Sequence, residues 1–231
     1  TALGLPLLQG YGQTETAPVV SANPPEKIKL DTVGTLFKGT EVKIAEDGEI
    51  LVRGENIMNG YWNDPEATNA TIIDGWVYTG DIGEFDEDQY LKITDRKKDI
   101  IVNAGGDNIS PSRVEEKLNI EPEIAQSMLY GDFKNYLVAI IIPDKEQAFA
   151  WAVKENKSKD LKLLIKDEDF IKMIKEITSK VNRKLSSIEH IRKFILVDEE
   201  FTIENDMMTP TMKIKRFKIK NIFGERLEGL Y

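Results

Sequence analysis

Cysteine is absent from the 231 residues, and His190 is the single histidine. Without cysteine the chain can form no disulfide and no thiolate metal site, and it has no cysteine nucleophile. One imidazole leaves no room for a histidine-based metal cluster or a conventional Ser-His-Asp triad. Any catalysis must therefore depend on Lys, Arg, Asp, Glu and Thr side chains and on backbone amides.

Long apolar runs are also missing. The longest purely aliphatic run, Leu137 to Ile142, is far too short to cross a bilayer and fits a buried strand better. The first residues, Thr1 to Pro6, have neither the charged region nor the long apolar core of a signal peptide, and the chain does not begin with Met. We therefore expect a segment from the middle of a longer, cytoplasmic protein.

Basic residues are fewer than acidic ones, 31 against 40. The net charge of −9 argues against a general affinity for nucleic acid, because phosphate backbones are held by an excess of Lys and Arg. Between Lys213 and Lys220, however, five basic residues occur with no acid among them. Such a stretch suggests a defined anionic ligand, although a solvated surface is the commoner explanation of a charge run. An anionic ligand, membrane lipid and water alone stay open as its partners.

The composition, 41% hydrophobic and 31% charged, is that of an ordinary globular protein, and its length favours two modest domains. Residues 1–94 are rich in β-branched residues and turn signals. Asp47-Gly48 favours the positive φ angles of a tight hairpin between Glu41–Ile44 and Glu49–Arg53. A second hairpin is predicted around residues 86–88. We expect a small antiparallel β-subdomain here.

Residues 95–231 alternate strand and helix patterns, which predicts a compact domain with a central sheet and gives the chain an α+β fold. Ser110-Pro111 is a typical helix start. Further predicted elements are strands at Ile124–Tyr130, Tyr136–Ile142 and Ile191–Val197, and helices after Asp144 and at Asp167–Leu185. In the last helix the apolar residues Phe170, Ile174, Ile177, Val181 and Leu185 recur at helical spacing and predict core packing. The residues after Val197 are expected to form an irregular tail.

Three segments carry residues suited to nucleotide chemistry. Residues 10–16 would place Tyr11 beside a base, Thr14 at a phosphate oxygen and Glu15 at a magnesium ion, which prefers hard oxygen ligands. Asp81 follows a glycine turn, where it could accept hydrogen bonds from ribose hydroxyls or simply face solvent. Lys213 lies in a Thr- and Pro-rich loop that could deliver a mobile ammonium to a carboxylate and a phosphate.

Taken in order, these segments resemble the adenylate-forming superfamily of acyl-CoA synthetases, luciferases and peptide-synthetase adenylation domains. The resemblance covers essentially the whole chain: Tyr-Gly-x-Thr-Glu, Thr-Gly-Asp, Asp-Arg-Lys-Lys-Asp with a Gly-rich turn, and a late Lys. Phe201–Asn205 and Thr209–Arg216 are similar to the long-chain fatty acyl-CoA ligases. Most relatives have Gly directly before the Lys, and this chain has Met212.

The resemblance implies a role for each matching residue. Gly10, Tyr11 and Gly12 correspond to the adenine-facing strand, Thr14 corresponds to the phosphate contact, and Glu15 corresponds to the magnesium ligand. Asp81 and Arg96 correspond to ribose contacts, and Asp95 corresponds to the hinge. Gly106 corresponds to the loop of the thioester step, and Lys213 corresponds to the catalytic lysine. Thr14 and Glu15 count with Lys213 among the catalytic residues. A missing side chain at Gly106 would let pantetheine pass. The short polar crossing at residues 94–99 suits a hinge, since few residues need change φ and ψ.

The implied activity is that of a long-chain fatty acid–CoA ligase. Its substrates would be a fatty acid, ATP with Mg²⁺, and CoA. The phosphate loop and the acyl pocket of the family lie upstream of the Tyr-Gly motif, and no comparable Gly-rich sequence precedes it here. We therefore expect negligible turnover from the chain by itself. Two alternatives stay open: a ligase for an aryl, short-chain or amino acid, and a non-catalytic module that keeps the fold.

Overall fold

The computed structural model describes residues 7–231, which divide into two compact units at the bond between Lys98 and Asp99. The residues without signal-peptide features, Thr1 to Pro6, lie outside the described part. The division falls after the boundary predicted at residues 94 and 95, because the last strand of the first unit continues through Arg96. Among the described residues, no helix has both the length and the apolar character needed to cross a membrane.

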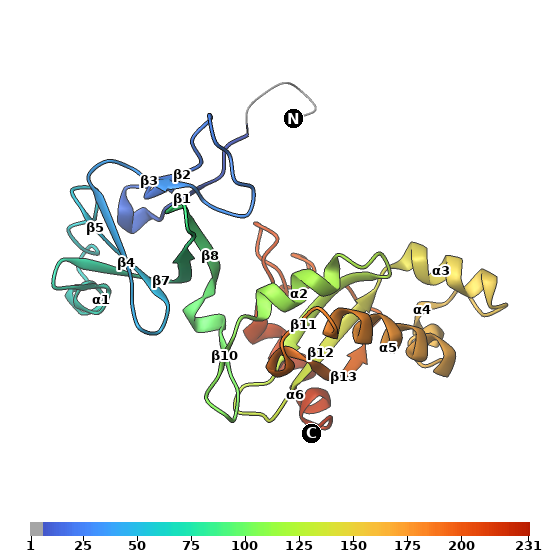
Figure 1. Ribbon diagram of the computed structural model, residues 1–231. Helices are drawn as coiled ribbons and strands as arrows, with labels where there is room; N and C mark the ends of the chain where they lie inside the picture. Colours follow the sequence, from blue (N-terminus) through green and yellow to red (C-terminus); the bar gives the residue numbers. More distant parts are fainter. Residues whose placement is uncertain (1–6) are drawn as a thin grey trace. The chain divides into compact units, whose positions relative to one another are not determined.

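The first unit consists of short antiparallel strands, drawn from blue to green in Figure 1. They are β1 (Gly10–Tyr11), β2 (Ser21–Ala22), β3 (Thr35–Leu36), β4 (Thr40–Ile44), β5 (Glu49–Gly54), β6 (Ile72–Ile73), β7 (Trp76–Phe85) and β8 (Leu91–Arg96), with α1 (Pro65–Thr71) and 3-10 turns at Thr14–Thr16 and Lys97–Asp99. One sheet has the order β1-β2-β3. The other has the order β4-β5-β7-β6, with β8 also paired to β7. The predicted antiparallel β-subdomain and both hairpins are confirmed.

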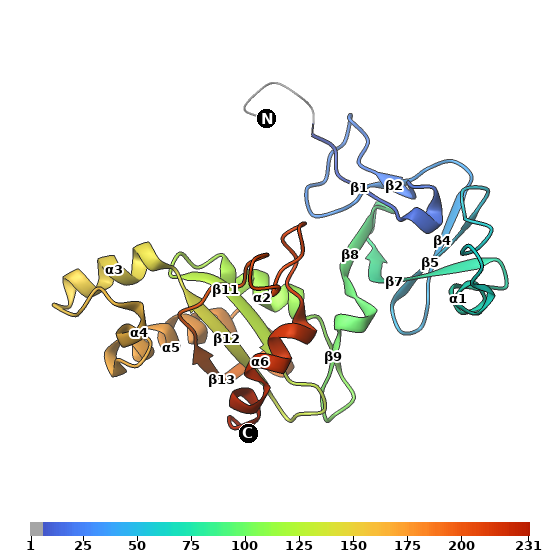
Figure 2. The same cartoon turned by 180° about the vertical axis from the view of Figure 1, so that it is seen from behind.

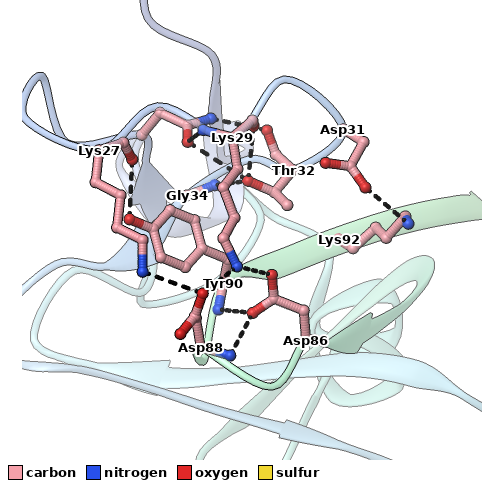
Figure 3. A network of polar contacts seen from close by, with 10 residues as sticks. Lys27, Lys29, Asp31, Thr32, Gly34, Asp86, Asp88, Tyr90 and Lys92 are labelled. Carbon is pink, nitrogen blue, oxygen red and sulfur yellow. Dashed lines mark hydrogen bonds and ion pairs between the residues drawn. The ribbon is translucent and has the colours of Figure 1, made fainter.

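A polar network fixes the loop before β3 to the β7–β8 turn (Figure 3). The Lys29 ammonium lies 2.6 Å from a carboxylate oxygen of both Asp86 and Asp88. It also lies over the ring of Tyr90, 4.6 Å from the centroid. The Tyr90 hydroxyl in turn donates to the Lys27 carbonyl at 2.9 Å. The network therefore holds together two loops that are distant in sequence.

The second unit is built on a three-stranded sheet in the order β11-β12-β13. Its strands are β9 (Ile101–Val102), β10 (Asn108–Ile109), β11 (Ile124–Tyr130), β12 (Leu137–Pro143) and β13 (Ile191–Leu196), and its helices are α2 (Pro111–Asn119), α3 (Lys145–Lys154), α4 (Leu161–Leu164), α5 (Glu168–Asn182), a 3-10 turn at Ser187–Glu189, and α6 (Arg216–Glu228). Strands β11 and β12 are antiparallel, and β12 and β13 are parallel. The α+β prediction is confirmed.

Strand β12 is buried on both faces, as predicted, because helices cover the sheet on both sides. Leu137, Ala139 and Ile141 pack into the core formed with α2, α3, α4 and α5. The alternate residues of β12 pack into a second core with α6. Figures 1 and 2, which view the chain from opposite sides, show α2 and α5 on one face of the sheet and α6 on the other.

Local sequence signals define two of the helix starts. Ser110 accepts a hydrogen bond from the Arg113 amide, and Asp144 accepts one from the Gln147 amide, so both are N-caps as predicted. The expected irregular tail is wrong, since α6 occupies much of it. Its buried residues Ile219, Phe223 and Leu227 recur at four-residue spacing and pack against the sheet.

Candidate functional site

The Tyr-Gly motif is shaped by packing of the chain against itself. Strand β1 ends at Tyr11, and the next residues turn into the 3-10 helix that presents Thr14 and Glu15. A Cβ atom on Gly12 would lie 1.6 Å from the Pro18 carbonyl oxygen, and one on Gly10 would lie 3.0 Å from the Ser21 carbonyl oxygen. Gly12 in particular is thus required by the fold, apart from any ligand.

Asp81 is the centre of the polar contacts on the β7–β8 pair. It lies opposite Arg96 in the register of these strands, and Arg96 Nε is 2.7 Å from Asp81 Oδ1. The other carboxylate oxygen, Oδ2, accepts hydrogen bonds of 2.7 Å from the Tyr11 hydroxyl and from Gln13 Nε2. The Asp81 residue is only 3% exposed, so it does not simply face solvent.

The charges around Asp81 are complementary. A buried carboxylate is stable when it is paired and hydrogen-bonded, and Asp81 has a guanidinium and two neutral donors. Burial, helped by the Asp81 charge, raises the pKa of Tyr11 above its usual range. The phenol therefore stays protonated and can donate its hydrogen bond at neutral pH.

A second acid–base group, not foreseen from the sequence, adjoins Asp81. Glu49 is 3% exposed, and its carboxylate accepts hydrogen bonds from the Gly80 amide at 2.9 Å and from Lys97 Nζ at 2.7 Å. Lys97 also lies 2.6 Å from Asp47 Oδ2. Hydrogen bonds to Asp47 and Glu49 raise the pKa of Lys97 to about 12. One sign of this buried carboxylate is visible in the sequence: Glu49 is the first residue of a strand, and the residues that follow it are apolar.

Glu15, the predicted magnesium ligand, contacts a residue from a distant loop. The Tyr61 hydroxyl donates to Glu15 Oε1 at 2.8 Å, and this hydrogen bond is the main cause that raises the pKa of Tyr61. Among residues 7–231, no cluster of three or more acidic or imidazole side chains could hold a metal ion. Glu15 fits a Mg²⁺ ion that takes one or two protein carboxylates and otherwise binds phosphate and water.

These groups surround one cleft of about 590 Å³ in the first unit. Its lining residues are Gly12, Gln13, Thr14, Glu15, Glu49, Tyr61, Ala70, Thr71, Tyr78, Thr79, Gly80, Arg96 and Lys97. The predicted residues Thr14, Glu15 and Arg96 are thus brought together. Tyr11 and Asp81 stand behind the lining and contact it through Gln13 and Arg96. Gly10 is not a lining residue.

Gly106 and Lys213 belong to the second unit. Gly106 lies in the turn between β9 and β10, where its φ of +86° favours glycine. A Cβ atom there would meet no atom within 4 Å. Asn103 holds this turn, because its Oδ1 accepts hydrogen bonds of 2.9 Å from the amides of Gly105 and Asp107.

Asp95, the predicted hinge, is the residue before the end of β8. It is 7% exposed and pairs with Ile82 in the sheet of the first unit. Its carboxylate accepts a hydrogen bond of 2.7 Å from the Arg96 amide. Asp95 therefore belongs to the anchored strand, and the chain leaves the first unit after Lys98, within the turn at Lys97–Asp99.

The basic stretch from Lys213 to Lys220 is largely paired within the second unit. Lys215 and Lys218 form ion pairs with Asp206, and they lower the pKa of Asp206 to about 2. Arg216 binds Glu115 through two bonds of 2.5 and 2.6 Å. Lys220 Nζ lies over the Tyr130 ring, 5.2 Å from its centroid. Within residues 7–231, only Lys213 of these five cations has neither an ion-pair partner nor an aromatic one.

Comparison with known proteins decides the family. Residues 1–62 match the AMP-binding enzyme family, and residues 98–231, more than half of the chain, match the AMP-binding enzyme C-terminal domain. The chain belongs to the AMP-binding enzyme family. The resemblance to AMP-forming acyl-CoA synthetases is thereby confirmed.

Two curated proteins of this family are similar to the chain over part of their own length. It is 39% identical to long-chain-fatty-acid–CoA ligase FadD15 of Mycobacterium bovis, covering 99% of this chain and 38% of that protein. It is 34% identical to long-chain-fatty-acid–CoA ligase 1 of Cavia porcellus, covering 100% of this chain and 35% of that protein. The chain thus spans less than two fifths of either relative.

Solved structures of the family share the fold. The A-PCP didomain of a carboxylic acid reductase from Segniliparus rugosus, in complex with AMP, superposes with a TM-score of 0.77 at 26% identity, over 99% of this chain and 32% of that one. O-succinylbenzoate CoA synthetase of Bacillus subtilis, also in complex with AMP, gives a TM-score of 0.69 at 27% identity, over 94% of this chain and 41% of that one.

Proposed function

We propose that the chain is part of a long-chain fatty acid–CoA ligase that forms an acyl-adenylate and then an acyl-CoA. The observation that carries this proposal is the arrangement around Asp81. Tyr11 and Asp81 are 70 residues apart in sequence, yet they are joined by a hydrogen bond beside a cleft that Thr14, Glu15 and Arg96 line. The names of the curated relatives, both long-chain-fatty-acid–CoA ligases, support the substrate class.

The cleft, together with the residues directly behind its lining, has the groups that an adenine nucleotide needs. Asp81 and Arg96 would hold the ribose hydroxyls, with Asp81 as acceptor and Arg96 as donor. Tyr11 would lie beside the base, next to the backbone of Gly10 and Gly12. Thr14 is exposed and could donate its hydroxyl to a phosphate oxygen.

Glu15 is the residue that would hold Mg²⁺, since Tyr61 contacts one of its two oxygens and leaves the other available. Bound there, the ion would neutralise charge on the phosphates of ATP. Tyr61 would keep the Glu15 carboxylate in a fixed orientation. Lys97 lines the same cleft, but Asp47 and Glu49 balance its charge.

Two bond exchanges make up the reaction. A carboxylate oxygen of the fatty acid attacks the α-phosphorus of ATP, and the bond to pyrophosphate breaks. The CoA thiolate then attacks the acyl carbon, and AMP leaves. Lys213 would stabilise the negative charge shared by the carboxylate and the α-phosphate in the first exchange. The Gly106 loop would serve the second after the second unit has swung about the segment at Asp95.

The test compares the chain with its full-length protein. With palmitate, MgATP and CoA, the full-length protein should release AMP and form palmitoyl-CoA, whereas the 231-residue chain alone should not. Robust AMP release by the chain alone would contradict the proposed division of the site. Aryl, short-chain and amino acids, tested in parallel, would reassign the substrate if one of them were activated faster than palmitate. A cytoplasmic location with peripheral membrane contact stays a prediction.

A further inference from the structure

The loop that presents Lys213 is a tight hairpin closed on Thr209. The Thr209 amide donates to the Lys213 carbonyl at 2.8 Å, and the Lys213 amide donates to the Thr209 hydroxyl oxygen at 3.1 Å. The Met212 amide donates to the Thr209 carbonyl at 2.9 Å. Thr209 therefore fixes the backbone of Lys213 through its amide and its side chain, and that of Met212 through its carbonyl.

Met212 completes the turn in a conformation that its side chain disfavours. Its φ is +62°, the left-handed region, and such a position commonly ends a three-residue hairpin loop. The side chain itself is 67% exposed. A non-glycine residue holds this conformation only where its surroundings impose it. The contacts of Thr209 are such a constraint.

The base of the hairpin is also anchored. Met208 and Ile214 form a β-bridge, and Met208 is buried in the core beneath α6. Arg216, the first residue of α6, makes its paired bonds to the buried carboxylate of Glu115 on α2. The hairpin is thus anchored at its base next to Lys213, and the Lys213 ammonium has no partner among the described residues.

From these contacts we infer that Thr209 is a positioning residue for the adenylation step, with its hydroxyl orienting the backbone from which the Lys213 ammonium extends. The inference rests on the proposed function, because it assigns Lys213 to the first bond exchange. Thr209 itself touches neither substrate nor reacting atoms in this role. A displaced ammonium would lose transition-state stabilisation, and misplacement by about 1 Å can cost on the order of 100-fold in rate.

The test uses three variants of the full-length protein. Thr209→Val removes the hydroxyl and keeps the shape of the side chain, and Thr209→Ser keeps the hydroxyl. Thr211→Val is the matched control, because the Thr211 hydroxyl lies 3.0 Å from that of Thr209 and has no contact with the Lys213 amide. Adenylation is measured by palmitate-dependent exchange of pyrophosphate into ATP, and thioester formation by adding palmitoyl-adenylate and CoA. Melting temperatures accompany both assays, and Thr209→Ala replaces Thr209→Val if that variant is unstable.

Thr209→Val should lower kcat of the exchange reaction by about 10- to 100-fold with little change in KM for ATP. Thr209→Ser and Thr211→Val should stay near the wild-type rate, and thioester formation should be unchanged in all three. The inference is overturned if Thr209→Val exchanges pyrophosphate normally, or if it slows both half-reactions equally. A wild-type protein that forms no palmitoyl-adenylate would instead overturn the proposed function.

Discussion

Asp81 and Arg96 are direct partners across β7 and β8, with Arg96 Nε 2.7 Å from Asp81 Oδ1. Tyr11 and Gln13 both donate to the second oxygen, so three donors meet at this carboxylate. These contacts fix its orientation. A ribose hydroxyl that donates to Asp81 would use the remaining lone pair of Oδ1 or replace one of the three donors.

Replacing Asp81 by Asn should weaken nucleotide binding. The change removes a charged acceptor, and hydrogen bonds to charged groups are worth about 1.5–3 kcal/mol, so the Kd for AMP should rise about 10- to 100-fold. Calorimetric titration of the full-length protein with AMP measures this Kd. Asp88→Asn, which alters a carboxylate outside the cleft, is the control. If Asp81→Asn and Asp88→Asn bound AMP with equal affinity, Asp81 would not be part of the nucleotide site.

Gly12→Ala should destabilise the first unit. The added Cβ would lie 1.6 Å from the Pro18 carbonyl oxygen, and such overpacking costs about 1–3 kcal/mol. Gly224→Ala is the opposite case, since a Cβ in the interior of α6 meets nothing within 4 Å and should stabilise the second unit by about 0.5–1 kcal/mol. Urea unfolding, followed by fluorescence in proteins that keep only Trp76 or only Trp151 of the three tryptophans, checks both. Unchanged stability of Gly12→Ala would show that the backbone around Gly12 and Pro18 can shift.

Substitutions of Gly106 separate its two possible roles. Ala should cost about 1–2 kcal/mol because of the positive φ, whereas Asn tolerates this region and should cost less. If the loop must also let pantetheine pass, both variants should slow thioester formation and leave adenylation intact. Recovery of thioester formation by Gly106→Asn would show that only the backbone conformation matters.

Acid should weaken the network of Figure 3. Hydrogen bonds from Lys29 lower the pKa of Asp86 and of Asp88 below the usual 3.8. Their contribution to stability is thus complete above the unfolded pKa and is lost as the pH falls through the lower folded values. Lys29→Met should therefore reduce the loss of stability that occurs below about pH 4. Acid unfolding at low and high salt measures this, and identical profiles for the two proteins would contradict it.

Features encoded by neighbouring residues were predictable from the sequence. The Asp47-Gly48 hairpin and the Ser110 cap depend on the conformational preferences of one or two residues, and both are present. The stripe of α5 was predictable for the same reason, since its apolar residues recur at helical spacing. The three buried residues of α6 are spaced similarly, but Gly224 and the many basic residues obscure the pattern.

Features that depend on tertiary contacts were not predictable. The ion pair between Glu49 and Lys97 could not be predicted from either residue, because the two side chains meet only after β5 and β8 have both paired with β7. Gln13 is adjacent to predicted site residues, yet its contact with Asp81 depends on the folded sheet. The basic stretch is the clearest example, since its ion pairs with Asp206 and Glu115 single out Lys213 only in three dimensions.

The most direct test of the account is the rate of palmitoyl-adenylate formation by the full-length protein with Lys213 replaced by Ala. Because the removed ammonium should stabilise charge in the first bond exchange, this rate should fall about 100- to 1000-fold, while thioester formation from added palmitoyl-adenylate continues at the wild-type rate. Lys218→Ala, which removes a cation already paired with Asp206, should leave both rates unchanged. Normal adenylate formation by the Lys213→Ala protein would contradict the account.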